Sequence, residues 1–127
     1  MKDYPRLPES ELDIMLVIWD LRDQAAAPAI LERLERPLTA SALHSYLKRL
    51  EDKGYLACTK EGKTNRYTPL VSREAYQRQE GKTILGKLYE GSLKRFAAAL
   101  HDGGALDKSD VEELRAYLEE LEGKEGQ

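Results

Sequence analysis

The N-terminal part of the chain carries apolar side chains at helical spacing. The pattern predicts a first helix from Pro8 to about Arg22, because proline suits a first helical turn, where its missing N–H would have no partner. Pro28 predicts the start of a second, short helix, and Pro37 predicts its end, because a residue before proline is pushed out of the helical region. The core-facing stripe of the first helix is predicted to consist of Leu12, Met15, Leu16 and Trp19.

The next segment predicts a third helix and then a change to strand-like spacing. Thr39 is a favourable N-cap for a helix that extends to Lys53, and Gly54 suits the left-handed position that follows a helix. Two short segments of strand-like composition follow, Tyr55–Lys60 and Asn65–Pro69, joined by a glycine-containing hairpin turn. Helices followed by a β-hairpin are typical of a winged helix-turn-helix.

Helical spacing returns after the hairpin and continues to the C-terminus. Ser72 is the predicted cap of a long helical stretch, which breaks near Gly91 because an interior glycine costs about 1 kcal/mol relative to alanine. Asp107 is the predicted cap of a last helix. The predicted fold is mainly α with a small β-hairpin (α+β): a winged-helix domain at residues 1–71 and a helical tail at 72–127.

The predicted third helix, residues 39–53, has an apolar side and a polar side. At about 100° per residue its leucines form one stripe, whereas the opposite side is polar and basic and carries no acid until Asp52. Such a side can enter the major groove of DNA, where hydroxyl, imidazole and cationic groups donate to base edges and phosphates. The alternative is an ordinary amphipathic surface helix. The predicted DNA contacts of this helix are Thr39, Ser41, His44, Ser45, Lys48 and Arg49.

The hairpin, residues 55–69, places further basic side chains beside the predicted recognition helix. A basic hairpin in this position gives a second contact with DNA, to the backbone or the minor groove. A purely structural hairpin is the alternative. The predicted DNA contacts of this wing are Lys60, Lys63, Asn65 and Arg66.

Charge is distributed unevenly along the chain, although the formal net charge is only −3. Residues 38–67 hold six basic and three acidic side chains, whereas residues 98–127 hold three basic and nine acidic ones. Because a phosphate backbone responds to the local field, the first segment suits nucleic acid and the second does not.

The last helix carries the pattern of a helix–helix interface. Val111, Leu114, Leu118 and Leu121 follow one another at spacings of three, four and three residues, which is an a/d-type seam. This stripe must be covered, either by the long helix of the same chain or by a second subunit. A homodimer is favoured because two linked DNA-binding domains can bind both halves of a two-fold-symmetric site. The predicted dimerisation residues are Leu85, Leu88, Tyr89, Leu93, Phe96, Leu100, Val111, Leu114, Leu118 and Leu121.

The sequence holds few residues suited to catalysis or metal binding. The single cysteine, Cys58, has no histidine near it in sequence, and His44 and His101 are far apart. No metal-ligand, phosphate-loop or nucleophile motif is present, so we expect no enzyme activity, no metal and no cofactor. One cysteine and the lack of a signal peptide predict a cytoplasmic protein, and the apolar run Ile14–Trp19 is too short for membrane insertion.

Three parts of the chain, the last of them made of two segments, resemble the penicillinase-repressor (BlaI/MecI-type) family of winged-helix transcriptional regulators. Leu7–Met15 with Trp19 resembles the opening helix of that family, and Leu43–Leu56 resembles its recognition helix and first wing strand. Leu88–Leu93 and Asp110–Arg115 resemble its dimerisation segment. The resemblance implies a bacterial homodimer that binds a dyad-symmetric operator on double-stranded DNA and represses transcription.

The resemblance also implies an upstream sensor or protease as a partner, because cleavage in the dimerisation region inactivates the antibiotic-responsive members. Those members carry Asn-Phe where this chain has Ala99-Leu100, and copper-responsive relatives carry paired C-terminal cysteines that this chain lacks. Ala42 and His44 also replace residues often found in the recognition helix. Neither the inducing signal nor the operator sequence therefore carries over from the family.

Two other functions fit the same elements. The basic side of a winged helix can bind an acidic protein instead of DNA, which would make the chain an interaction module without sequence-specific DNA binding. A ligand-sensing regulator would need a pocket between the winged domain and the tail, and no motif marks one.

Overall fold

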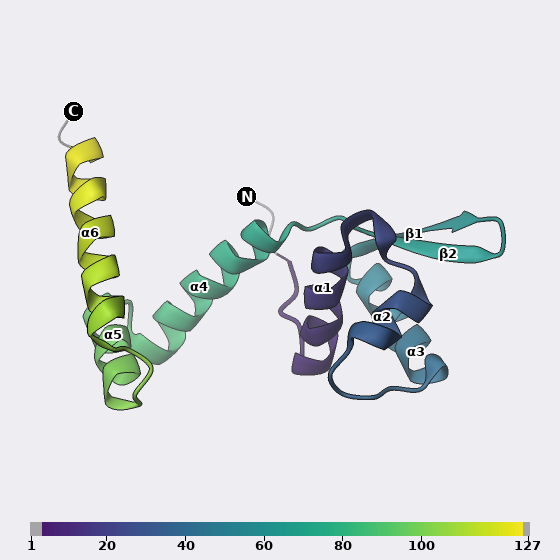
Figure 1. Cartoon of the computed structure of the whole chain (residues 1–127), viewed down its shortest axis with the longest axis horizontal. Helices are drawn as coiled ribbons and strands as arrows, with labels where there is room; N and C mark the ends of the chain where they lie inside the picture. The colour runs from purple at the N-terminus through teal and green to yellow at the C-terminus, as the bar shows by residue number, and fades with distance from the viewer. Residues whose placement is uncertain (1–3, 126–127) are drawn as a thin grey trace. The chain divides into compact units, whose positions relative to one another are not determined.

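The computed structural model describes residues 4–125; the outermost ends of both predicted regions, residues 1–3 and 126–127, lie outside the described part. Helices and one antiparallel hairpin make up the fold, which confirms the predicted α+β class (Figure 1). The elements are α1 (Glu9–Leu21), a 3₁₀ turn η1 (Arg22–Gln24), α2 (Ala27–Arg33), α3 (Ala40–Asp52), β1 (Leu56–Glu61), β2 (Thr64–Pro69), α4 (Arg73–Tyr89), α5 (Leu93–Asp102) and α6 (Lys108–Glu125).

The chain divides by compactness into two units, Met1–Glu80 and Gly81–Gln127, and the division falls within α4. The first half of α4 belongs to the N-terminal unit because it bonds to the segment before α1. The backbone N–H of Leu7 donates to the hydroxyl of Tyr76 over 3.3 Å, and the side chain of Gln79 bonds to both backbone groups of Tyr4. The functional division at residues 71 and 72 stays a prediction.

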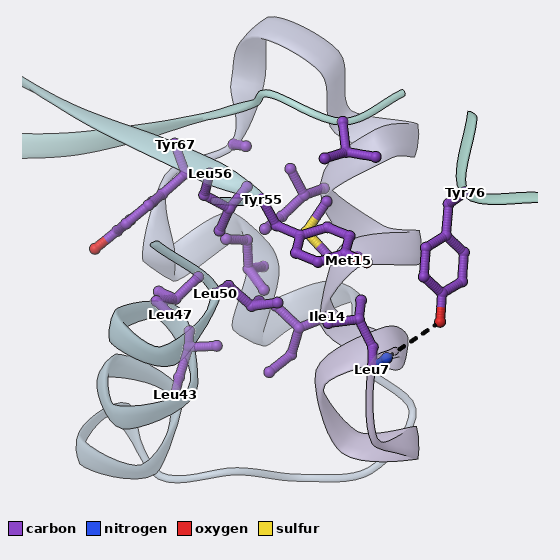
Figure 2. Close-up of a cluster of buried hydrophobic side chains, with 14 residues drawn as sticks. Leu7, Ile14, Met15, Leu43, Leu47, Leu50, Tyr55, Leu56, Tyr67 and Tyr76 are labelled. Carbon is purple, nitrogen blue, oxygen red and sulfur yellow. Dashed lines mark hydrogen bonds between the residues drawn. The ribbon is translucent and has the colours of Figure 1, made fainter. Parts of the chain in front are cut away.

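The core of the N-terminal unit collects apolar side chains from α1, α2, α3, the hairpin and α4 (Figure 2). Its centre includes Tyr55, which is fully buried and whose hydroxyl donates to the carbonyl of Pro5 over 2.5 Å. Burial raises the pKa of Tyr55 well above its ordinary value of 10.0. The neutral phenol is therefore the form that this core holds.

The buried face of α1 differs from the predicted stripe. Ile14, Met15 and Ile18 are fully buried, whereas Leu12 and Trp19 are half-buried and Leu16 is 39% exposed. The run from Ile14 to Trp19 is apolar on every side of the helix, so helical spacing alone cannot select the side that faces the core.

The helix α2 ends earlier than predicted, at Arg33, because Leu34 already has an extended backbone. Pro37 is therefore not its direct terminator. Before α2, the chain pairs briefly with the hairpin: Ala26 forms a bridge with Arg66, and the N–H of Tyr67 donates to the carbonyl of Ala25 over 2.8 Å. This short pairing attaches the base of the hairpin to the helices.

The hairpin has a two-residue turn. Glu61 pairs with Thr64, so Gly62 and Lys63 form the loop. Gly62 has a φ of +63°, while Lys63 does not have a positive φ, which is the pattern of a type II′ turn with glycine in its first central position. Tyr55, predicted as the first strand residue, instead precedes β1 and donates its N–H to the carbonyl of Leu50 at the end of α3.

An ion pair between a buried carboxylate and a half-buried lysine connects α1 with the end of α3. The carboxylate of Glu11, which is 3% exposed, accepts a hydrogen bond from the ammonium of Lys53 over 2.5 Å. Removing one partner of a buried pair leaves a buried charge without compensation, which costs far more than removing both. The pair therefore fixes how these two helices meet.

We expect Lys53→Met to lower the free energy of unfolding by about 3 kcal/mol, measured by urea denaturation. Lys48→Met is the matched control, because Lys48 pairs with the exposed Asp52 over 3.5 Å. The control should change stability by less than about 0.5 kcal/mol. The double variant Glu11→Met/Lys53→Met should recover part of the loss; a double variant less stable than Lys53→Met would contradict this interpretation.

The C-terminal unit comprises the end of α4 with α5 and α6. The predicted break lies where expected: Gly91 has a φ of +78°, and the hydroxyl of Ser92 caps α5 by accepting the N–H of Arg95 over 3.1 Å. Asp107 caps α6 through the N–H of Asp110 over 2.9 Å, as predicted. None of the helices in residues 4–125 has the length and apolar character needed to cross a membrane.

Candidate nucleic-acid interface

The helix α3 has the orientation that its leucines predict. Leu43, Leu47 and Leu50 are at most 1% exposed and point into the core of the N-terminal unit (Figure 2). The opposite side of the helix is therefore turned to solvent. Its exposed residues include all the predicted contacts of this helix: Thr39, Ser41, His44, Ser45, Lys48 and Arg49.

The start of α3 is held by its own cap. The hydroxyl oxygen of Thr39 accepts the N–H of Ala42 over 3.0 Å, and the carbonyl of Thr39 accepts the N–H of Leu43 over 3.0 Å. Because the hydroxyl serves as an acceptor in this cap, its proton is still available to a phosphate oxygen. Thr39 can therefore begin the helix and contact DNA at the same time.

The two cations of α3 have weak partners within the chain. Lys48 lies 3.5 Å from the carboxylate of Asp52, with both side chains largely exposed. Such surface pairs contribute about 0–1 kcal/mol, so Lys48 can exchange Asp52 for a phosphate at small cost. The guanidinium of Arg49 lies over the ring of Tyr46, 5.5 Å from its centroid, which limits its motion while leaving its donors free to bind.

The hairpin extends away from α1, α2 and α3 (Figure 1). Lys60 and Asn65 pair with each other across the strands, and both are exposed, as is Lys63 in the turn. Strand alternation places Lys60 and Asn65 on the same face as Tyr67, which is buried against the core. Three of the four predicted wing contacts, Lys60, Lys63 and Asn65, are thus exposed to solvent.

Arg66 differs from the other predicted cationic contacts because its guanidinium donates to two partners within the chain. One terminal nitrogen of its guanidinium donates to the carbonyl of Asp23, and its Nε donates to the carboxylate of Glu61 over 3.1 Å. Its side chain is 34% exposed. Arg66 lies on the strand face opposite to that of Lys60 and Asn65.

The remaining chemistry-bearing residues lie apart from one another. Cys58 is exposed on β1, and His101 in the C-terminal unit lies 3.7 Å from Asp102. Within residues 4–125, no group of three or more histidine, cysteine or acidic side chains is arranged to hold a metal ion.

The C-terminal unit leaves many of its apolar residues exposed. The described side chains of α6 include none that is buried. Of the predicted dimerisation residues, Leu88 is 70% exposed, and Leu93, Val111, Leu114 and Leu118 are also exposed. The others are half-buried within the unit: Leu85, Tyr89, Phe96, Leu100 and Leu121. The rings of Tyr89 and Phe96 contact each other across the turn between α4 and α5, with centroids 4.9 Å apart.

Two aromatic residues adjoin these surfaces and are absent from the predicted sites. Tyr117 is 53% exposed and lies on the same side of α6 as Leu114, three residues away. Its spacing from Leu114 is the signal in the sequence that indicates this position. Tyr46 is half-buried against the core, and its position three residues before Arg49 is the signal for the contact between them.

Comparisons with known proteins agree over most of the chain. A family model described as "Penicillinase repressor" matches residues 7–120. The penicillinase repressor of Bacillus licheniformis is 29% identical over 122 residues, which cover 94% of this chain and 94% of that protein. The methicillin resistance regulatory protein MecI of Mammaliicoccus sciuri is 25% identical over 114 residues, or 88% of this chain and 92% of that protein.

A solved structure matches the N-terminal part. The solution structure of the DNA binding domain of the repressor BlaI aligns with a TM-score of 0.51 and 29% identity, over 60% of this chain and 94% of that chain. This match and the element order confirm the predicted winged-helix fold.

Proposed function

Because this chain belongs to the penicillinase-repressor family, whose members are repressors and not enzymes, we propose that it is a homodimeric transcriptional repressor that binds a dyad-symmetric DNA operator. Membership confirms the resemblance drawn from the three parts of the sequence. DNA is the proposed partner because the matched solved structure is a DNA binding domain. In this proposal α3 enters the major groove and the hairpin contacts the adjacent backbone.

The observation that carries the proposal is the exposed polar side of α3, fixed in place by three buried leucines. This side carries two cations, an imidazole and hydroxyl groups. The acid at its C-terminal end, Asp52, is already paired with Lys48. Ser41, His44 and Ser45 lie where they can donate to base edges, while Lys48 and Arg49 can neutralise phosphates. Lys60, Lys63 and Asn65 give the hairpin a second contact.

The partner proposed for the C-terminal unit is a second copy of the chain. Its support is the exposed apolar side of α6, which includes Val111, Leu114 and Leu118. Charge favours the same occupant: residues 81–100 hold four basic side chains and one acid, whereas residues 108–125 hold three basic and seven acidic ones. Two copies can therefore place the acidic α6 of one against the basic segment of the other.

Selection of bound sequences from a random duplex pool tests this function. The expected result is a palindromic consensus whose two halves are centred about one helical turn or a multiple of it apart, because a symmetric dimer presents two equivalent recognition helices. The affinity for the consensus should fall steeply with salt. Weak binding without a consensus and with a shallow salt dependence would contradict the proposal and favour an interaction module.

A further inference from the structure

The hairpin is attached to the rest of the N-terminal unit at one edge, and Arg66 is the centre of this attachment. The backbone of Arg66 pairs with that of Ala26, and the N–H of the next residue, Tyr67, donates to the carbonyl of Ala25 over 2.8 Å. The side chain of Arg66 adds a donor to the carbonyl of Asp23 in η1. Backbone and side chain together therefore hold β2 against the segment before α2.

The same guanidinium also binds within the hairpin. Its Nε donates to Glu61, which is the diagonal neighbour of Arg66 across the strands because Glu61 pairs with Thr64. A planar guanidinium can serve a carbonyl and a carboxylate at once, whereas an ammonium is a point charge on a flexible stem. The two hydrogen bonds of Arg66 therefore depend on the planar shape of its guanidinium as well as on its charge.

Arg66 is poorly placed to bind the phosphate that Lys60 and Asn65 would meet. Those two residues lie on the opposite strand face, which they share with the buried Tyr67. To reach a ligand on that side, the Arg66 side chain would have to leave both Asp23 and Glu61. Its position favours a role inside the protein.

We propose that Arg66 is a positioning residue for the wing and not a phosphate ligand: its guanidinium fixes the direction of the hairpin so that Lys60 and Lys63 reach the DNA backbone. This inference rests on the proposed function. It differs from the DNA contact that the sequence predicts for Arg66, since a basic residue beside a wing turn looks the same in sequence whether it faces DNA or the protein.

The test compares Arg66→Gln with Lys63→Gln, which removes the same charge from the turn. Full-length proteins are titrated with the selected duplex between 50 and 200 mM salt, and log Kd is plotted against log salt. A lost phosphate contact should lower the slope by about 0.9 for each subunit. We expect that decrease for Lys63→Gln and an unchanged slope for Arg66→Gln, although Arg66→Gln binds about tenfold more weakly.

The conservative variant Arg66→Lys distinguishes shape from charge. If Arg66 positions the wing, Arg66→Lys also binds more weakly than the wild type, because lysine cannot serve both partners. A slope lowered by about 0.9 per subunit in Arg66→Gln, with binding restored in Arg66→Lys, would overturn the inference. Failure of the wild type to select any duplex would instead overturn the proposed function.

A measurement without DNA tests the positioning role separately. In Arg66→Lys, the Tyr67 amide should exchange its hydrogen faster, because its bond to Ala25 is next to the lost contacts. The Leu70 amide, which donates to Tyr55 over 2.8 Å, is the internal control and should keep its protection. Unchanged exchange at Tyr67, or equal acceleration at both amides, would contradict the inference.

Discussion

Replacement of Lys48 and Arg49 together by alanine is expected to weaken binding of the dimer to its selected duplex by roughly 100- to 1,000-fold. Each lost contact costs about 1 kcal/mol, and a dimer loses four of them. If all four cations meet phosphates, the slope of log Kd against log salt should fall by about 3.6. Folding should be unaffected, because both side chains are exposed and their partners within the chain are weak.

The charge-matched control for this double variant is Arg22→Ala/Arg78→Ala. It removes the same charge from two exposed positions, in η1 and α4, that lie outside α3, the hairpin and the proposed dimer interface. If binding depends on overall charge alone, the two double variants should lose equal affinity. The proposed interface requires the α3 variant to lose at least tenfold more than the control, measured by fluorescence anisotropy at a fixed salt concentration.

The sequence predicted α3 well because several independent signals coincide there. Thr39 caps the helix, Gly54 follows it with a φ of +86°, and the leucines repeat at one consistent spacing. Local chemistry at both ends and one apolar stripe leave a single orientation for the helix. This orientation determines which side of α3 is exposed, and the exposed side is the candidate interface.

Other features depend on contacts that are distant in sequence. In α1, the apolar run Ile14–Trp19 fits several orientations, and only packing against the rest of the core selects one. Glu11 appears in sequence as an ordinary first-turn acid, although it is buried against Lys53, 42 residues later. The role of Arg66 likewise depends on a carbonyl in η1. Spacing within one element carries no information about such partners.

Replacement of Leu114 and Leu118 together by aspartate is expected to convert the dimer to a monomer. Both side chains are more than 40% exposed in the single chain, so their replacement leaves the fold of one copy intact. In a dimer the same positions become buried, and an isolated carboxylate in an apolar interface carries a large desolvation penalty. Analytical ultracentrifugation should therefore give the mass of one chain at micromolar concentrations.

The control is Ala116→Asp, which introduces one carboxylate of the same kind about 200° away around α6 on its exposed far side. This variant should remain a dimer if the seam on the Leu114 side is the interface.

The monomeric variant should also bind the palindromic duplex at least about 100-fold more weakly, because the second half-site is no longer reached at high effective concentration. A dimer that persists in Leu114→Asp/Leu118→Asp, or one that Ala116→Asp dissociates equally well, would place the interface elsewhere. The acidic helix would then need a different partner, and the symmetric operator would lose its structural basis.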